Sequence, residues 1–329
     1  MYLPHSYEIA LLFMVGSMLC WGSWANAMKL CPGYRFQLFY WDYLIGLLAG
    51  VILLGLTLGS IGSVGTPFLA DLLHAPHGAI AYAVAGGIVF NIANLLLVAA
   101  IEVAGMAVAF PVGIGLALVV GAISSYLIAP QGNPLLLFGG IFLVVVAIVC
   151  DSLAYREREI GRTQGNARGI VLSLLAGLLM GTFYPLVSKA MTGPAAPGPY
   201  ATSFFFVIGT ILCSLPLNYF FMRKPIDGGT PVTLGGFTSA PTRWHLAGIL
   251  GGAIWVCGGT LNFVASRIHF VGPAVSYSIG QGATMVSALW GVFVWREFRS
   301  PSPRVLTLLI VMFLAFIAGL TAIAIAPIF

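Results

Sequence analysis

The chain has 329 residues, of which 60% are hydrophobic and only 7% are charged, and its formal net charge is +5. A soluble domain usually carries about 25% charged residues to cover its surface. So little charge excludes a water-soluble globular fold and predicts a protein whose solvent is largely lipid. The positive net charge does not predict nucleic-acid binding, because the sequence has no basic stripe with interleaved aromatic residues.

Ten apolar runs follow one another along the chain, each of about the 20 residues needed to cross the hydrocarbon core of a bilayer. Most connections are short, and the longer polar segments 154–168 and 222–244 are typical of surface loops. The sequence therefore predicts an all-α integral membrane protein with ten transmembrane helices. The runs are 7–28, 39–58, 78–100, 106–128, 134–153, 169–191, 200–221, 245–266, 272–295 and 305–325.

Positive charges are distributed unevenly between the two sides that these ten runs define. All but two of the 14 lysine and arginine residues fall in connections that follow odd-numbered runs, the exceptions being Lys189 and Arg267. Lysine and arginine in short loops mark the cytoplasmic side. We therefore expect both termini outside, in the plasma membrane. The short loops and the lack of a targeting segment favour a bacterial inner membrane.

The two halves of the chain carry similar motifs in the same order. Five helices in each half is an odd number, so the second half must enter the membrane from the opposite side, as in many secondary transporters. We expect two inverted five-helix repeats, 1–153 and 169–329, joined by a cytoplasmic linker at 154–168. The matched motifs are Gly16 to Trp24 with Gly177 to Tyr184, Gly86-Gly87 with Gly251-Gly252, and Pro111 to Gly115 with Ser278 to Gly282.

Glycines spaced four residues apart occur in several of the runs. Such spacing lets helix backbones approach closely in a membrane, so a packing role is favoured for these glycines. The patterns are Gly46 with Gly50, Gly55 with Gly59, Gly177 with Gly181, and Gly248 with Gly252.

Four segments carry a resemblance to a known family. They are Tyr40-Trp41-Asp42-Tyr43, Leu56-Thr57-Leu58-Gly59-Ser60-Ile61-Gly62, Ala85-Gly86-Gly87-Ile88-Val89 followed by Asn94-Leu95, and Ser287-Ala288-Leu289-Trp290-Gly291-Val292-Phe293 followed by Glu297-Phe298-Arg299. The chain resembles the plant ureide permeases, without their long central cytosolic loop. That family belongs to the drug/metabolite transporter superfamily, with the rhamnose–proton and glucose porters. The resemblance implies ten helices in two inverted repeats and proton-coupled uptake of allantoin, uracil or a similar heterocycle.

Functions other than uptake of a ureide or nucleobase also have to be considered for this sequence. A sugar–proton symporter of the rhamnose or glucose type and a drug or metabolite exporter would both suit the same fold. A membrane-embedded enzyme is disfavoured, because the five histidines lie in loops or at helix ends. ATP-driven transport by this chain is disfavoured because it has no P-loop. We expect a secondary transporter with no cofactor or metal, whose partners are a small polar solute, protons and lipid, as a monomer or homodimer.

Polar residues at mid-helix depth are the candidates for the solute site, because they are costly in lipid and tend to face a cavity or another helix. Asparagine and glutamine amides offer both a donor and an acceptor, and aromatic rings offer a stacking face. Hydrogen bonds between helices would explain the same residues almost equally well. The candidates for substrate binding are Trp24, Asn91, Asn94, Tyr184, Trp255, Tyr277 and Gln281.

Proton coupling requires a titratable group, and Asp42 is the candidate because it lies inside the second run and within the family-like motif. A carboxylate that stabilises a helix N-terminus would explain Asp42 equally well. Lys29 and Lys189 occupy equivalent places in the two halves, where they would either snorkel to the interface or pair with Asp42. Since the other acidic residues lie near helix ends, a facilitated uniporter is the alternative mechanism.

Overall fold

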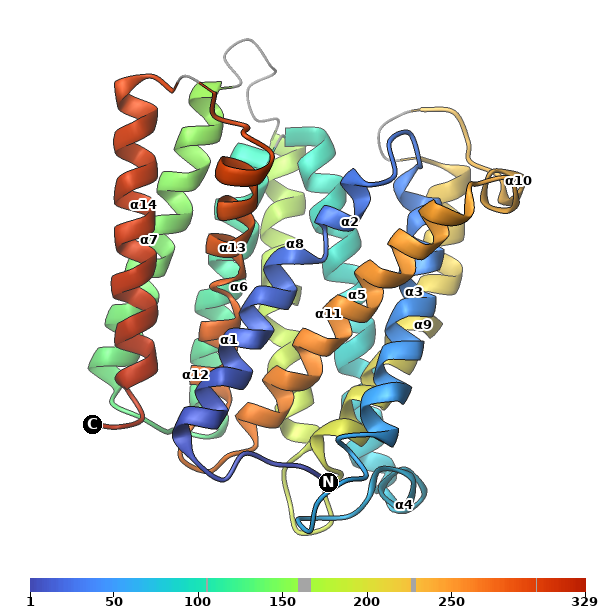
Figure 1. Ribbon diagram of the computed structural model, residues 1–329, viewed down its shortest axis with the longest axis vertical. Helices are drawn as coiled ribbons and strands as arrows, with labels where there is room; N and C mark the ends of the chain where they lie inside the picture. Colours follow the sequence, from blue (N-terminus) through green and yellow to red (C-terminus); the bar gives the residue numbers. More distant parts are fainter. Residues whose placement is uncertain (105, 159–166, 226–228, 300) are drawn as a thin grey trace.

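The computed structural model describes residues 1–104, 106–158, 167–225, 229–299 and 301–329, and these residues form helices without any strand. In chain order the helices are α1 (Tyr7–Ser23), α2 (Asn26–Lys29), α3 (Phe36–Leu56), α4 (Phe68–His74), α5 (His77–Ala104), α6 (Met106–Ile128), α7 (Pro134–Arg158), α8 (Ala167–Ala190), α9 (Pro199–Arg223), α10 (Leu234–Thr238), α11 (Thr242–Ser266), α12 (Gly272–Gly280), α13 (Ala283–Leu289), the π-helix η1 (Trp290–Val294) and α14 (Pro303–Ile325). Figure 1 shows α7, α14, α6 and α8 standing roughly parallel, with α1 and α11 running obliquely across the molecule.

Eight helical segments of the described chain are long and apolar enough to cross a membrane. They confirm an all-α, multi-pass integral membrane protein. Two further apolar stretches run beside them, namely α6 and the broken series α12, α13 and η1. The spanning segments are α1 with α2, α3, α5, α7, α8, α9, α11 and α14.

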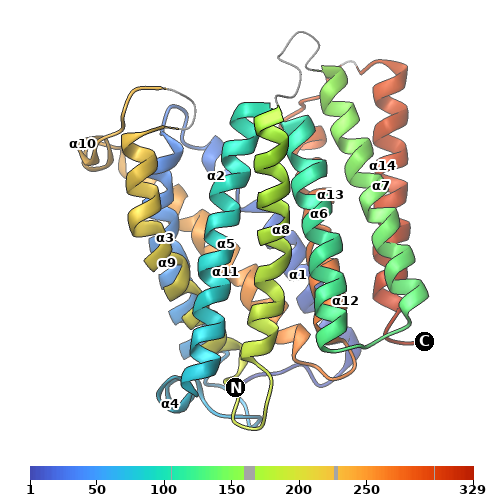
Figure 2. The ribbon, with the colours of Figure 1, turned by 180° about the vertical axis from the view of Figure 1, so that it is seen from behind.

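The helices pack as two bundles and one separate pair. Helices α5, α6, α8 and α9 form what we call the first bundle, and α1, α3, α11, α12 and α13 form the second bundle. Helices α7 and α14 pack on each other at one edge of the molecule (Figure 1). From behind, α5, α6 and α8 of the first bundle cover the crossing helices α1 and α11 (Figure 2). Each bundle therefore combines helices from both halves of the chain.

Glycines bring helix backbones together inside the first bundle. A Cβ atom added at Gly87 of α5 would collide with the Phe206 carbonyl of α9. One added at Gly209 of α9 would collide with the Val84 carbonyl of α5. Such close approach replaces the hydrophobic driving force, which is absent between helices in lipid, with dispersion contacts between backbones.

The second bundle contains the corresponding contacts. A Cβ atom at Gly252 of α11 would collide with the Tyr43 carbonyl of α3, and one at Gly46 of α3 with the Ile249 carbonyl of α11. The two bundles therefore use the same reciprocal pair of glycine contacts.

A third pair of contacts follows the same rule between other helices. A Cβ atom at Gly181 of α8 would collide with Val120 of α6, and one at Gly22 of α1 with Val286 of α13. In each case a glycine from one half of the chain packs on a residue from the other half.

The molecule has two chemically different ends. Both termini lie at one end, which we call the terminal end. The C-terminal end of α7 and the described residues of the connections after α2, α9 and η1 lie at the other, which we call the basic end (Figure 1). These connections and the helix ends beside them carry Lys29, Arg35, Arg223, Lys224 and Arg296. The segregation of basic residues expected from the sequence is therefore present in space for the described residues.

Replacing Gly252 with alanine should destabilise the protein by about 1–3 kcal/mol, because the added methyl group overpacks a backbone contact. The measurement is the thermal unfolding midpoint of the purified protein in detergent. Gly139→Ala in α7 is the matched control, since a Cβ atom there meets nothing within 4 Å. Equal midpoints for the two variants would contradict the tight α3–α11 contact.

Candidate functional site

A cavity of about 180 Å³ lies between the two bundles. The first bundle contributes residues of α5, α6 and α8, and the second bundle contributes residues of α1, α11 and α13. On α5 these residues lie between the middle of the helix and its basic end, and on α8 they lie near the middle of the helix. The lining residues are Trp21, Gly22, Trp24, Ala25, Phe90, Asn94, Leu97, Ile114, Met180, Phe183, Trp255, Gln281, Ala283, Thr284 and Ser287.

Aromatic rings form the deep wall of the cavity. The ring of Trp255 lies 4.5 Å from that of Phe90 between centroids, and it stacks on Trp21 at 5.8 Å with planes inclined by 27°. Trp24 packs on Tyr43 at 5.0 Å. Flat, polarisable surfaces of this kind bind other planar rings and the apolar faces of sugars.

Glycines hold the Trp21 ring in place. A Cβ atom added at Gly280 or at Gly258 would lie less than 3.0 Å from this indole. The indole Nε1 is buried and has no hydrogen-bond partner within the described chain. Trp21 therefore presents a rigid face to the cavity.

Two amides supply the polar part of the lining. Asn94 of α5 donates a long hydrogen bond of 3.5 Å to the Tyr40 hydroxyl. Gln281 occupies the break between α12 and α13, where the helix is interrupted by Gly280 and Gly282. Broken helices at membrane depth occur where backbone lines a cavity. Both amides line a small, mostly apolar cavity, in which each can donate and accept hydrogen bonds.

The structure brings four of the seven predicted substrate-binding residues to this cavity, namely Trp24, Asn94, Trp255 and Gln281. The other three, Asn91, Tyr184 and Tyr277, lie outside the lining.

Each of those three bonds to another helix. The Tyr40 hydroxyl donates to Asn91 Oδ1 at 2.5 Å, and the Tyr184 hydroxyl donates to Asn262 Oδ1 at 2.5 Å. The Tyr277 hydroxyl donates to the Ala117 carbonyl at 3.1 Å. Their role as solute ligands stays a prediction.

Asp42 is buried between α3 and α11, outside the cavity lining. Its carboxylate accepts hydrogen bonds from Nδ1 of His245 at 2.8 and 3.0 Å and from the Tyr34 hydroxyl at 2.8 Å. The Asp42 side chain is 1% exposed and that of His245 is 23% exposed. Burial and the Asp42 carboxylate raise the pKa of Tyr34 well above its usual value, so Tyr34 stays a donor at neutral pH. The three residues form a closed acid–base cluster near the basic end.

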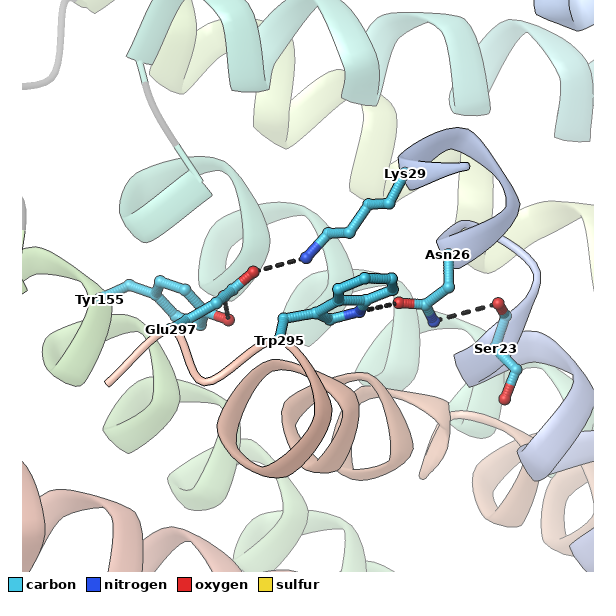
Figure 3. Close-up of polar contacts among 6 residues, drawn as sticks. All are labelled: Ser23, Asn26, Lys29, Tyr155, Trp295 and Glu297. Atoms are coloured by element: carbon cyan, nitrogen blue, oxygen red, sulfur yellow. Dashed lines mark hydrogen bonds and ion pairs between the residues drawn. The ribbon is translucent and has the colours of Figure 1, made fainter. Parts of the chain in front are cut away.

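Lys29 does not pair with Asp42, so that alternative of the prediction is wrong, whereas snorkelling of Lys29 to the interface stays a prediction. Lys29 Nζ lies 2.6 Å from Glu297 Oε1, and Glu297 Oε2 accepts from the Tyr155 hydroxyl at 2.7 Å (Figure 3). Beside this pair, Trp295 Nε1 donates to Asn26 Oδ1 at 2.5 Å. Lys29 is placed by the turn after α1, which directs its chain toward the end of η1 rather than toward α3.

Sequence reasoning missed two participants. In the sequence, Trp21 belongs to a repeat motif and is not among the predicted solute ligands. Its position three residues before Trp24 puts both side chains on one face of a helix, and this spacing is the signal that could have identified it. His245 is 203 residues from Asp42 in the chain. Nothing local in the sequence signals that pairing, which depends on the packing of α11 against α3.

Comparison with known proteins identifies the family. The Ureide permease family model matches residues 39–167 and 156–326. The chain belongs to the ureide permease family. Ureide permease 1 of Arabidopsis thaliana is 24% identical over 97% of both chains, and Ureide permease 2 of the same plant is 24% identical over 97% of both chains. The members are named permeases, so this chain is a membrane transporter and not an enzyme.

Two further similarities are more distant. The Glucose uptake protein GlcU of Bacillus subtilis (strain 168) is 22% identical over 66% of this chain and 69% of its own. A solved crystal structure superposes with a TM-score of 0.65 at 16% identity, covering 96% of both chains. The first extends the relationship to a porter outside the ureide permeases, and the second agrees with the fold alone.

Proposed function

We propose that this transporter takes up a small, planar, polar solute of the ureide or nucleobase kind, coupled to protons, by alternating access. The observation that carries the proposal is the cavity between the two bundles, which has aromatic walls and is lined by the amide of Gln281. A planar oxo-heterocycle has flat faces for Trp255 and Trp21 and edge groups for the two amides. Apolar walls with a few placed polar groups are typical of small-molecule sites.

The proposed architecture is ten membrane-spanning segments in two inverted five-helix repeats. The reciprocal glycine contacts support it, because Gly87 with Phe206 repeats as Gly252 with Tyr43. This count of ten includes α6 as one span and the series α12, α13 and η1 as another. The basic end is then cytoplasmic, both termini are outside, and the 154–168 segment joins the repeats inside a bacterial cell.

Proton coupling is assigned to Asp42 with His245. Partial exposure of His245 at the basic end gives protons an aqueous route to a carboxylate that is otherwise buried. Gly248 packs on the Asp42 side chain so closely that a Cβ atom there would collide with it. A change in the charge of Asp42 therefore acts directly on the α3–α11 contact, which is part of the second bundle.

A sugar is the second candidate solute. The relative from Bacillus subtilis is named a glucose uptake protein, and a sugar would also stack on Trp255 and bond to amides. Export of amphipathic compounds is the third possibility, and a reversed gradient tests it. All three share the cavity and differ in solute and direction.

Gln281→Ala should lower solute uptake into proteoliposomes at least tenfold, because a solute bonded to this amide loses both a donor and an acceptor. The assay uses labelled allantoin, uracil, rhamnose and glucose with an inward proton gradient. Gln37→Ala is the control, since Gln37 is a buried glutamine that does not line the cavity. Sugar uptake in place of heterocycle uptake would replace the solute class, and normal uptake by Gln281→Ala would contradict the site.

Asp42→Asn should abolish uptake driven by the proton gradient while solute counterflow continues. The amide can still accept hydrogen bonds from Tyr34 and His245, but it cannot bind and release a proton. The measurement is uptake with and without a gradient, alongside counterflow of preloaded solute. Asp71→Asn is the matched control, because Asp71 is buried at the terminal end, where it accepts from the Gly198 N–H at 2.7 Å. Gradient-driven uptake by Asp42→Asn would indicate a uniporter or another coupling group.

A further inference from the structure

A second cavity lies at the terminal end, separated from the first by a thin layer of side chains. It has a volume of about 220 Å³. Along α8, Phe183 lines the first cavity and Ser188 lines the second, with Tyr184 between them. The residues of the second cavity that carry polar or ionisable side chains are Gln131, Ser188, Thr192, Ser266, Arg267 and His269.

One hydrogen bond between the two bundles, and two more within the second bundle, close this layer. The Tyr184 hydroxyl of the first bundle donates to Asn262 Oδ1 of the second at 2.5 Å. Asn262 Nδ2 in turn donates to Ser17 Oγ at 3.1 Å and to the Ser276 carbonyl at 2.9 Å. Along α11, Asn262 lies between Trp255 of the first cavity and the start of the second. The layer is thus a polar seal at the terminal end.

The reciprocal glycine contacts give the register between the two halves of the chain. They align Gly22 of α1 with Gly181 of α8, and Gly87 of α5 with Gly252 of α11. In an inverted repeat, exchanging the conformations of aligned residues turns a cavity open at one end into a cavity open at the other.

Residues at equal distances from the aligned glycines correspond to each other, and on this basis residues of the seal correspond to residues that line the open cavity. Tyr184 aligns with Ala25, and Asn262 aligns with Leu97. Ala25 and Leu97 both line the open cavity, whereas Tyr184 and Asn262 are fully buried in the seal. Of each aligned pair, one residue therefore lines the open cavity and the other is buried in the seal at the opposite end.

Helices α6 and α13 also contain an aligned pair in which one residue lines the open cavity and the other is buried. The contacts of Gly181 with Val120 and of Gly22 with Val286 align Ala117 with Ala283. Ala283 lines the open cavity, whereas Ala117 is buried and its carbonyl accepts from Tyr277.

We infer that Tyr184 and Asn262 form a second solute-binding site, which this structure keeps closed and which opens to the terminal end. The inference rests on the proposed alternating access of a small polar solute. In the second state the Tyr184 hydroxyl and the Asn262 amide exchange their mutual bond for bonds to that solute, and Ala117 becomes part of the cavity wall.

The aromatic wall belongs to both states. Phe90 aligns with Trp255 and Trp24 aligns with Phe183, and all four line the open cavity. Exchange of the two halves therefore returns the same four rings to the cavity. A solute held by these rings changes its polar partners, from the amides near the basic end to Tyr184 and Asn262, while it keeps its stacking surface.

The two closed ends are not equal in energy. Ala25 and Leu97, the counterparts of the seal residues, cannot form a hydrogen bond between their side chains. Closing the terminal end gains a bond that closing the basic end does not provide. Loss of the Tyr184 hydroxyl should therefore favour the state that is open to the terminal end.

Paired alanine-to-cysteine variants of the full chain test the second state. A membrane-impermeant thiol reagent is applied to each face of sealed vesicles, and mass spectrometry of the labelled peptides separates the new thiol from the five native cysteines. The Ala283→Cys variant should react from the face at the basic end, and the Ala117→Cys variant from the face at the terminal end. An unreactive Ala117→Cys variant, or one that reacts from the same face as Ala283→Cys, would overturn the inference.

Wild-type uptake measured in parallel separates this inference from the proposed function. Uptake of a tested solute with an unreactive Ala117→Cys variant overturns the second site alone. Labelling from opposite faces without uptake of any tested solute retains the second state and overturns the proposed solute class.

The Tyr184→Phe substitution tests whether loss of the Tyr184 hydrogen bond favours the state that is open to the terminal end. Added to Ala117→Cys, it should raise the labelling rate from the terminal face roughly fivefold, because a net hydrogen bond contributes about 1 kcal/mol. Added to Ala283→Cys, it should lower the labelling rate from the basic face. The control is Tyr43→Phe, whose buried hydroxyl has no hydrogen-bond partner within the described chain. Equal rates for the Tyr184→Phe and Tyr43→Phe backgrounds would show that the Tyr184 bond does not hold the seal.

Discussion

Backbone contact at glycine is the constraint on which this structure depends. Between helices in lipid there is no hydrophobic force to drive association, so packing and a few polar bonds must supply the stability. The chain meets this requirement with 41 glycines, several of which sit where any side chain would collide with a facing carbonyl. Gly87 and Gly252 hold α5 against α9 and α11 against α3. Because these contacts are made by backbone atoms, they fix each bundle as a unit and leave the space between bundles to side chains.

That division explains where the cavity lies. Inside each bundle the glycine contacts leave no room for a solute, whereas large aromatic residues line the cavity between the bundles. Trp255, Phe90 and Trp21 act as spacers that leave a gap lined by flat faces. The polar bonds that cross the gap, such as Tyr184 with Asn262, lie on the terminal side of the rings. A transporter needs rigid parts with a weak, polar boundary between them, and this packing supplies both.

The sequence predicted the helical membrane fold, the segregation of basic residues and four of the cavity residues, because these follow from composition and from helix position. Run length and charge are local properties, and Gln281 is a candidate because it is a polar residue at mid-helix depth. The sequence did not predict the partner of Asp42 or of Lys29, because both pairings join helices from opposite halves of the chain. It also did not distinguish Asn94, which lines the cavity, from Asn91, one turn away, which bonds to Tyr40 and Ser214. Which face of α5 meets the gap is decided by the glycine contact with α9, and propensity contains no information about it.

The same glycines that fix the bundles also make the two halves of the chain comparable residue by residue. Once Gly22 is aligned with Gly181, the difference between the two ends of the molecule becomes a difference between named side chains. Where one half has Ala25, the other has Tyr184, and where one has Leu97, the other has Asn262. In the proposed inverted repeat, symmetry alone would make the two open states equally stable, so a preference for one state would come from such substitutions. In the proposed repeat, the hydrogen bonds of the polar seal therefore stabilise the state seen in this structure, because they form only when the terminal end is closed.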